Sequence, residues 1–451
     1  MIGISGPVFR PDDDGYDAER TGYNLALADH HRPALVVGAT GPADVAAAIR
    51  YASAAGLAVA VQATGHGISA DTHGQLVIST RRMKGVQVDP EARTARIAAG
   101  VRWHEVLAET APYGLAPLSG SNPDVGAVGY TLGGGIGLLG RRYGFAADHV
   151  RRLDVVTADG QLRQATADRE PDLFWALRGG KDNFGVAVSM EIDLVPVATL
   201  LGGGLYFPGE AADDVLHGYA EWTRTVPEEM SSSLQLIRYP DLPVLPEPLR
   251  GRYVAHLRIA WSGPEEQGRR WVRPLRELGP LLMDTVRLLP YREVGTIHHE
   301  PPLPVAAYDR NTALRALDPA AVDTLLDLAG PQADAPIILE IRHQGGAYSR
   351  PPAVPNAVGG RDAAYMLFST HILEPDRLEE IRYAHGGLHD KLRPWSTGGA
   401  FVNFFGIDDA TPDTVRTAYH PADYRRLAAL KAAWDPGNLF RLNYNIPPAR
   451  T

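Results

Sequence analysis

The chain contains no cysteine among its 451 residues. This absence excludes disulfides, thiolate metal sites, cysteine nucleophiles and any cofactor linked through a cysteine. Lysine is scarce as well, since arginine supplies nearly all of the positive charge, and the formal net charge is -9. The sequence therefore lacks the basic footprint of a DNA- or RNA-binding protein, and no nucleic-acid partner is expected.

Long apolar runs are also missing. No stretch of 18 apolar residues occurs, so no segment is expected to span a membrane. The N-terminal residues lack a basic stretch followed by an apolar core, which argues against a signal peptide. Together with the absence of cysteine, these features favour a cytoplasmic protein. A chain of 451 residues is too long for one compact core and predicts two or more domains.

Strand-like and helix-like segments alternate between residues 34 and 200. Helices are predicted over 40–56, 103–114 and 171–180, and strands over 57–64, 75–80, 92–100, 153–165 (a hairpin) and 185–197. In the first of these helices, Pro42 suits the first turn and Gly56 the end. The last strand alternates apolar and polar residues, which predicts that it is half-exposed.

After residue 200 the pattern changes. Prolines cluster at 240–248, 301–304 and 351–355, and strand candidates alternate with helices such as 321–330 and 375–392. This pattern predicts an α+β domain built around an antiparallel sheet with flanking helices. The expected division is residues 1–200, residues 201–420, and a C-terminal segment, 421–451, that returns to the first domain.

Two glycine-rich stretches mark a binding region. The first, "QATGHGIS" at 62–69, follows a predicted strand, and the second, "VGAVGYTLGGGIGLLGRRYG", covers 125–144. The second contains a literal G-x-G-x-x-G at Gly135, Gly137 and Gly140. A nicotinamide-binding fold needs a full helix and a later acidic residue after that motif, and neither is present. The leucines and the isoleucine of this second stretch are too apolar for a solvated loop. Glycines let backbone amides approach a flat or anionic ligand, so both stretches are expected to close on one long ligand.

Four segments in the right order, over residues 34 to 448, resemble one family of flavoenzymes. They are "PALVVGATGPADVAAAIRYASAAGLAVAVQATGHGIS", "SGSNPDVGAVGYTLGGGIGLLGRRYGFAADHV", "DLFWALRGGKDNFGVAVSMEIDL" and "LKAAWDPGNLFRLNYNIPP". The chain resembles the vanillyl-alcohol oxidase and p-cresol methylhydroxylase superfamily, in its berberine-bridge-enzyme-like branch. The resemblance implies a two-subdomain FAD-binding domain and a cleft beneath a substrate domain.

The resemblance also implies how FAD is held. The family's histidine that bonds the flavin 8α-methyl group falls on His66, and Asn122 stands where many relatives have a second, cysteinyl link. Any covalent attachment would therefore pass through His66 only. The cofactor-binding residues expected are His66, Gln62, Ala63, Thr64, Gly65, Gly67, Ser69, Asn122, Val125, Gly126, Gly129, Leu132, Gly133, Gly135, Gly137, Gly185, Val186, Asn443 and Asn445. For Asn122, a simple turn before Pro123 is an equal alternative. Val125, at the family's gatekeeper position, favours an oxidase that uses O2.

The reaction also needs a base to remove a hydroxyl or amine proton. The catalytic candidates are Tyr444, Glu340 and His343. A strand over 337–345 places Glu340 and Arg342 on one face and His343 on the other, and the sequence leaves open which face meets the flavin. The family's "Y-x-N-Y" segment is Phe401-Val402-Asn403-Phe404 here, which removes a phenolate base from that segment.

A metal site is not expected. The segment "TIHHEPP" at 296–302 offers His298, His299 and Glu300, but adjacent histidines point apart in an extended strand and no third ligand is placed by spacing. The segment is therefore interpreted as a solvated loop.

The function expected is an FAD-dependent oxidase. It would remove hydride from a hydroxyl- or amine-bearing carbon of a small organic molecule, sugar or natural-product intermediate, with O2 as acceptor. The alternative is a flavin-free relative that acts as a non-redox, lyase-like or binding scaffold. The partners expected are a hydroxylated or glycosidic small molecule and O2, and a homodimer is the assembly considered.

Overall fold

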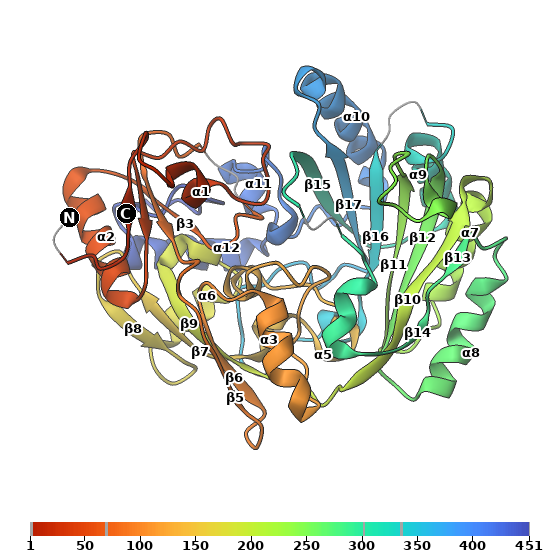
Figure 1. Ribbon diagram of the computed structural model, residues 1–451, viewed down its shortest axis with the longest axis horizontal. Coiled ribbons are helices and arrows are strands. Elements are labelled where there is room, and N and C mark those ends of the chain that lie inside the picture. Colours follow the sequence, from red (N-terminus) through yellow and green to blue (C-terminus); the bar gives the residue numbers. More distant parts are fainter. Residues whose placement is uncertain (1–2, 68–70, 301–302, 334–336, 451) are drawn as a thin grey trace.

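The computed structural model describes residues 3–67, 71–300, 303–333 and 337–450. Within these ranges the strands form three sheets, of four, five and eight strands. The two smaller sheets lie on one side of the molecule and the large sheet lies on the other (Figure 1). The α+β class predicted from the sequence is confirmed.

The four-stranded sheet has the order β1-β2-β4-β3, with β1 (Val8–Phe9), β2 (Leu35–Gly38), β3 (Val59–Gln62) and β4 (Leu76–Ser79). Strand β2 pairs with β4 in parallel, and so does β3. Helix α1 (Tyr16–Arg20) precedes β2, and helix α2 (Pro42–Ala55) ends at Gly56, whose φ of 69° is left-handed. Glycine adopts this conformation without the steric cost that other residues incur, so the helix ends where the sequence predicts.

The five-stranded sheet has the order β5-β6-β9-β7-β8. Its strands are β5 (Val86–Asp89), β6 (Thr94–Ala98), β7 (Val150–Val156), β8 (Leu162–Ala165) and β9 (Val186–Asp193). The prediction of a half-exposed strand at 185–197 is wrong for its first part, because Val186, Ala187 and Val188 are buried in succession. Ala187 packs in one hydrophobic cluster, whereas Val186 and Val188 pack in another, so both faces of this part of β9 are covered.

Short helices connect strands of the five-stranded sheet: α3 (Trp103–Thr110), α4 (Ala127–Leu132) and α5 (Gly140–Tyr143) lie between β6 and β7, and α6 (Pro171–Leu177) lies between β8 and β9. The predicted helices over 103–114 and 171–180 are thus present in shorter form. Among the described residues, every helix is too short or too polar to serve as a transmembrane span.

The large sheet is antiparallel and has the order β13-β10-β12-β11-β16-β17-β15, with β14 also paired to β10. Its strands are β10 (Thr199–Pro208), β11 (Met230–Arg238), β12 (Tyr253–Trp261), β13 (Met283–Asp284), β14 (Arg287–Pro290), β15 (Ala307–Leu314), β16 (Ile338–His343) and β17 (Tyr365–Ile372). Helices α7 (Ala212–Thr223), α8 (Glu265–Arg276) and α9 (Pro319–Ala329) cover its outer face, and its other face turns toward the smaller sheets (Figure 1).

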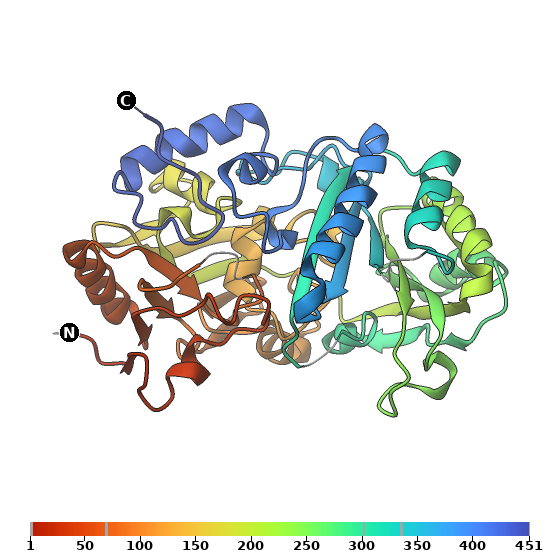
Figure 2. The ribbon, with the colours of Figure 1, turned by 90° about the horizontal axis from the view of Figure 1, so that it is seen from above.

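The chain finishes on the side of the smaller sheets. After α10 (Leu378–Lys391) and α11 (Pro412–Arg416), helix α12 (Pro421–Trp434) and the tail lie along the half formed by the early residues (Figure 2). The Asn183 side chain donates to the Tyr444 carbonyl oxygen at 2.9 Å and accepts from the Ile446 amide at 2.8 Å. The tail is thereby fixed beside the segment that precedes β9.

Two histidines of α10 are held neutral against β17. The Ser369 hydroxyl lies 2.9 Å from His385 Nδ1 and 3.0 Å from His389 Nε2. Burial lowers the pKa of each of these histidines to about 3. The unfolded chain therefore binds more protons than the native state between pH values of about 6.5 and 3. In that window the free energy of unfolding decreases as the pH is lowered.

We expect acidification from pH 6.5 to pH 5 to cost roughly 2 kcal/mol of unfolding free energy for each of the two histidines. The double variant His385→Gln/His389→Gln should lose less stability over the same range. Urea unfolding at the two pH values measures this, with His73→Gln, at an exposed histidine, as the control. An unchanged pH dependence in the double variant would contradict the prediction.

Candidate functional site

The two glycine-rich stretches lie against each other. Strand β3 ends at Gln62, and the backbone that follows runs beside the start of α4. The Gly126 amide nitrogen lies 3.4 Å from Thr64 Oγ1. A Cβ atom on Gly126 would lie 3.3 Å from the Ala63 Cβ, closer than most such contacts. The close approach requires a small residue on both sides, which explains the composition of these stretches.

His66 lies at the end of this junction with one nitrogen unused. Its Nδ1 is 2.8 Å from Thr64 Oγ1, and its ring stacks on Tyr23 with centroids 4.1 Å apart. Its Nε2 is buried and has no hydrogen-bond partner within the described part of the chain. Burial lowers the pKa of His66 to about 4, so the imidazole is neutral near pH 7. A neutral ring with a free nitrogen lone pair can act as a nucleophile or ligand.

The predicted glycines have two kinds of surroundings. A Cβ atom on Gly67 or Gly129 would meet no atom within 4 Å among the described residues. By contrast, a Cβ on Gly133 would collide with the Asn403 side chain, and one on Gly137 with the Ser119 carbonyl. Gly135 and Gly185 have φ values of 78° and 146°, and a Cβ would press on Tyr130 and on Val156, respectively. The structure thus accounts for these four glycines by contacts within the protein.

Several other predicted cofactor residues have protein partners. The Gln62 side chain is buried, lying 2.9 Å from His31 Nε2 and donating to the Arg20 carbonyl at 3.1 Å. Leu132 and Val186 are core residues. The Asn122 side chain accepts from the Asp124 amide at 2.8 Å, which is the turn that the sequence allowed. Gly65 has a φ of 68°, and its carbonyl accepts from the Asn24 amide. Ser69 lies outside the described residues.

Two of the C-terminal candidates, Asn443 and Tyr444, lie beside Asp182 and Lys181. Asn443 donates to the Asp182 carboxylate, and the Tyr444 hydroxyl donates to the Phe405 carbonyl oxygen at 2.8 Å. Asn445 Oδ1 is buried without a hydrogen-bond partner in the described ranges. Lys181, which the sequence analysis did not select, donates to Asn403 Oδ1 at 2.7 Å and has a left-handed φ of 57°.

The polar face of the large sheet is the one turned toward the glycine-rich segments. Glu340 is buried there between two arginines: Arg258 Nη1 lies 3.0 Å from Oε1, and Arg342 Nε donates to the same oxygen at 3.0 Å. Arg342 Nη2 also lies 3.4 Å from the Ser121 hydroxyl, next to Asn122. Burial raises the pKa of Glu340, but Arg342 and Arg258 outweigh burial and hold that pKa well below its usual range.

His343 belongs to the opposite side of β16, together with the core residues Leu339 and Ile341. Its Nε2 accepts from Arg141 Nη1 at 2.6 Å, and its ring stacks on Tyr365. Burial, with the nearby Arg141 charge, holds the pKa of His343 well below its usual range. His343 nevertheless lines the cavity described below, whereas Glu340 does not line it but shares a face of β16 with Arg342, which does. Arg141 holds His343, and the Tyr444 hydroxyl donates to Phe405.

The interpretation of residues 296–302 as a solvated loop is wrong for His298. This side chain is buried, and its Nε2 lies 3.4 Å from Glu340 Oε1. His299 is exposed. Adjacent side chains point apart, so one histidine enters the protein while the other meets solvent. No group of three or more His, Asp or Glu side chains in the described ranges is arranged to hold a metal ion.

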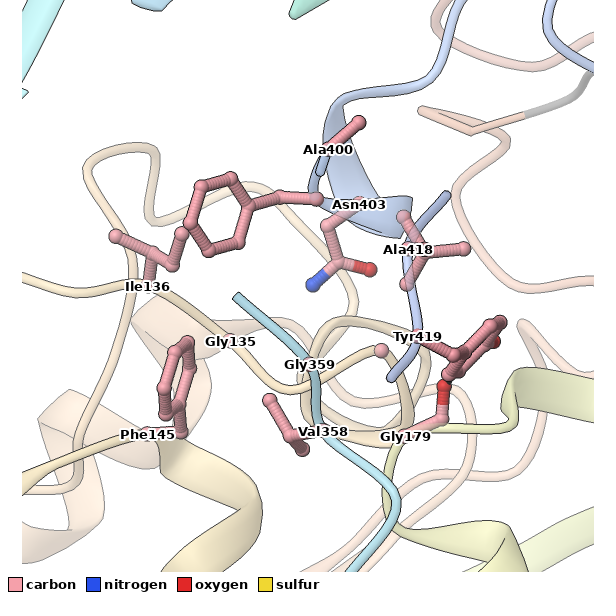
Figure 3. A pocket seen from close by; sticks show the side chains of 13 residues that line it. Gly135, Ile136, Phe145, Gly179, Val358, Gly359, Ala400, Asn403, Ala418 and Tyr419 are labelled. Atoms are coloured by element: carbon pink, nitrogen blue, oxygen red, sulfur yellow. Dashed lines mark hydrogen bonds between the residues drawn. The ribbon is translucent and has the colours of Figure 1, made fainter. Parts of the chain in front are cut away.

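Two cavities lie between the glycine-rich segments and the rest of the chain. One, of about 380 Å³, is bounded by Ser121 and the Ile136–Leu138 segment on one side and by the polar sheet face on the other. The second, of about 310 Å³, is mostly apolar. Ile136, Phe145, Val358 and the amide of Asn403 point into it (Figure 3). The Phe401–Phe404 segment thus packs directly on the glycine-rich loop.

Comparison with known proteins agrees with this geometry. Residues 33–166 match the FAD binding domain family, and residues 400–447 match the family described as berberine and berberine like. The (R)-6-hydroxynicotine oxidase of Paenarthrobacter nicotinovorans is 30% identical to this chain over an alignment of 476 residues. The alignment covers 99% of this chain and 98% of that protein. The chain belongs to the berberine-bridge-enzyme-like FAD-linked oxidoreductases. The family resemblance found in the sequence is thus confirmed, and the protein is an FAD-linked oxidase.

Solved structures of this family share the fold throughout. The crystal structure of 6-hydroxy-D-nicotine oxidase from Arthrobacter nicotinovorans superposes with a TM-score of 0.81 at 25% identity, covering 100% of this chain and 99% of that one. Chitooligosaccharide oxidase superposes with a TM-score of 0.85 at 22% identity, covering 99% and 98%. The second likeness shows the fold alone.

The residues of this chain fit an FAD group. The unpartnered, buried Nε2 of His66 offers a bonding position, and the open space over Gly67 and Gly129 leaves room for a ligand beside the backbone. The chain would hold FAD along the junction of 63–67 with 126–129. When bound, the flavin supplies the hydride acceptor.

Sequence reasoning missed Arg258 and His298, and it did not connect Ser121 with the site. A signal existed for Arg258: in "YVAHLRIAW", the polar residues His256 and Arg258 alternate with apolar ones, so one face of β12 is polar. For His298 the local sequence gave no such signal, because this side chain is buried only when its segment docks on Glu340.

Proposed function

We propose that the protein oxidises a hydroxyl- or amine-bearing carbon of a small molecule, bound in the cavity of about 380 Å³, and passes the electrons to O2. The observation that carries the proposal is the placement of this cavity between the glycine-rich junction and the charged sheet face. The half-buried Val125, expected at the gatekeeper position, supports O2 as the acceptor. The absence of cysteine supports a cytoplasmic location.

We also propose that FAD is attached covalently through His66 alone. The support is the free, buried Nε2 of a neutral ring, together with Asn122 in place of a second link. Residues 1–200 would bind FAD, residues 201–420 the substrate, and residues 421–451 would close the FAD site. The first strand of the large sheet, β10, begins at Thr199, which supports this boundary.

Among the candidate proton acceptors, we favour Glu340 over His343 and Tyr444. Glu340 is ionised and shares a face of β16 with the cavity-lining Arg342. His343 lines the cavity itself but already accepts a hydrogen bond from Arg141, and the Tyr444 hydroxyl donates to the Phe405 carbonyl oxygen. Its role would be to accept the substrate proton while Arg342 and Arg258 fix the carboxylate.

Purified protein provides the first test of this function. It should be yellow, and it should release peroxide from one or more members of a panel of sugars, alcohols and amines. A colourless protein without FAD would instead support the flavin-free scaffold.

Glu340→Gln should lower kcat/KM by about 10²- to 10⁴-fold, because the amide cannot accept the substrate proton. Peroxide release across a pH series measures this, and Tyr444→Phe and His343→Gln serve as matched variants of the other two candidates. A larger loss in either of those, with Glu340→Gln near wild type, would move the proton acceptor to that residue.

A further inference from the structure

Three side chains of adjacent strands form a row on the cavity side of the large sheet. In the antiparallel register, Ser233 of β11 stands opposite Arg258 of β12 and opposite Arg342 of β16. Residues directly opposite each other share a face, with Cβ atoms about 4.5–5.5 Å apart. All three line the cavity of about 380 Å³. We call Arg258, Ser233 and Arg342 the donor row.

The donor row carries more positive than negative charge. Two guanidiniums share the single buried carboxylate of Glu340, which leaves a formal charge of +1. Burial, followed by the Arg258 charge, lowers the pKa of the adjacent His298 to about 4, so it adds no charge near pH 7. Glu300 also acts on Arg342 electrostatically, but it is only half-buried, so solvent screens it.

The His343 end of the cavity adds another cation. Arg141 is buried, and it donates to the backbone carbonyls of Met230 and Val226 as well as to His343. Neutral carbonyl acceptors leave its charge in place. Arg141 does not line the cavity, but its charge lies behind His343, which does, and together with the donor row it disfavours a protonated amine.

Two polar atoms of the donor row are buried without a partner. Arg258 Nε and Ser233 Oγ have no hydrogen bond within the described ranges. An unpaired buried polar group costs about 1–3 kcal/mol, so a site of this kind is expected to be completed by a ligand. Both carboxylate oxygens of Glu340 already accept from Arg342. A ligand group beside Arg258 must therefore accept a hydrogen bond, because Arg258 Nε can only donate. Elsewhere in the cavity, atoms of His298, His343 and Gln344 without a partner among the described residues leave positions for other groups of the same ligand.

We propose that the donor row binds a carboxylate group of the substrate. A carboxylate only accepts hydrogen bonds, carries the charge that the row lacks, and matches the planar geometry of guanidinium groups. The inference rests on the proposed function and narrows it: the oxidised molecule is an organic acid.

Calorimetric titration of the holoenzyme tests the donor row with three compounds that share a phenyl ring and differ in the charge of their polar group. Sodium benzoate should bind at least about tenfold more tightly than benzamide, a difference of about 1.4 kcal/mol, and benzylamine should bind more weakly than either. Equal binding of benzoate and benzamide, or tighter binding of benzylamine, would overturn the proposal.

Variants assign the binding to these residues. Arg258→Gln/Glu340→Gln leaves the formal charge of the row at +1 and leaves no buried carboxylate of the row without a counter-ion, but it removes the Arg258 Nε donor, which is unpartnered within the described residues. It should weaken benzoate about tenfold or more, through the lost charge-assisted hydrogen bond, while changing benzamide less than about twofold. Ser233→Ala, which removes one small hydroxyl, should weaken benzoate about threefold or more and covers the case in which the double variant does not fold. Arg292→Gln, at an exposed arginine, is the control. Wild-type benzoate affinity in Ser233→Ala and in any folded double variant would reject the donor row.

The two proposals can fail separately. Calorimetry reports benzoate binding whether or not the protein carries flavin, so a colourless protein that binds benzoate would reject the oxidase proposal alone. A yellow protein that releases peroxide from a substrate, yet binds benzoate no better than benzamide, would reject only the carboxylate assignment.

Discussion

Replacing His66 by alanine is expected to abolish covalent attachment of FAD completely. The denatured wild-type protein should have the mass of the polypeptide plus one FAD, and the variant should have the mass of the polypeptide alone. The physical reason is that Nε2 of His66 is buried at the glycine-rich junction without a partner among the residues that the structure describes, on a ring that stays neutral near pH 7. In the absence of cysteine, no thiol can replace it.

Mass spectrometry after acid denaturation measures the effect. His73→Ala is the matched control, because it removes an exposed histidine close by in the sequence. Retention of the FAD mass in His66→Ala would place the bond on another residue. A yellow wild-type protein with the mass of the bare polypeptide would show that FAD is held without a covalent bond.

The second large effect is expected from Lys431→Met. Lys431 and Asp435 are fully buried, with Nζ 2.7 Å from Asp435 Oδ2. Nζ also donates to the carbonyl oxygens of Asn183 at 2.6 Å and Phe440 at 3.1 Å. The substitution leaves the buried Asp435 carboxylate without its counter-ion, although the Leu439 and Phe440 amides still donate to it. The loss should cost about 3–5 kcal/mol and detach α12 from the segment before β9.

Urea unfolding measures this loss of stability. Lys391→Met, at an exposed lysine, should change stability by less than about 0.5 kcal/mol. The double variant Lys431→Met/Asp435→Asn should regain part of the loss, since the remaining group is neutral. A single variant as stable as the wild type would mean that the buried pair does not fix the tail.

Local sequence patterns predicted much of the first half of the fold. The helix from Pro42 ends at Gly56 because proline and glycine restrict or permit particular backbone angles regardless of what lies nearby. The pattern misjudged the strand over 185–197, where alternation suggested exposure. Its exposure depends on what packs on each face of the sheet, and Ala187 lies in one hydrophobic cluster while Val186 and Val188 lie in another.

The site was predictable in its cofactor half and not in its substrate half. The small residues around Ala63 and Gly126 are a local requirement of close backbone approach, so their composition is visible in the sequence. The partners of Glu340 are Arg258 and His298, which lie on other segments. Pairing between them depends on strand register and on loop docking, and neither leaves a local pattern.

The sequence by itself determined the family and the cofactor class, because the order of four motifs and the placement of glycines are properties of the chain read in one direction. Only the tertiary structure decided that the Glu340 face of β16 turns toward the glycine-rich segments, that His298 is buried, and that Arg258, Ser233 and Arg342 stand in one row. These facts follow from how strands pair and which face the helices cover, and the apolar face went to α7 and α9 because burying it stabilises the fold most.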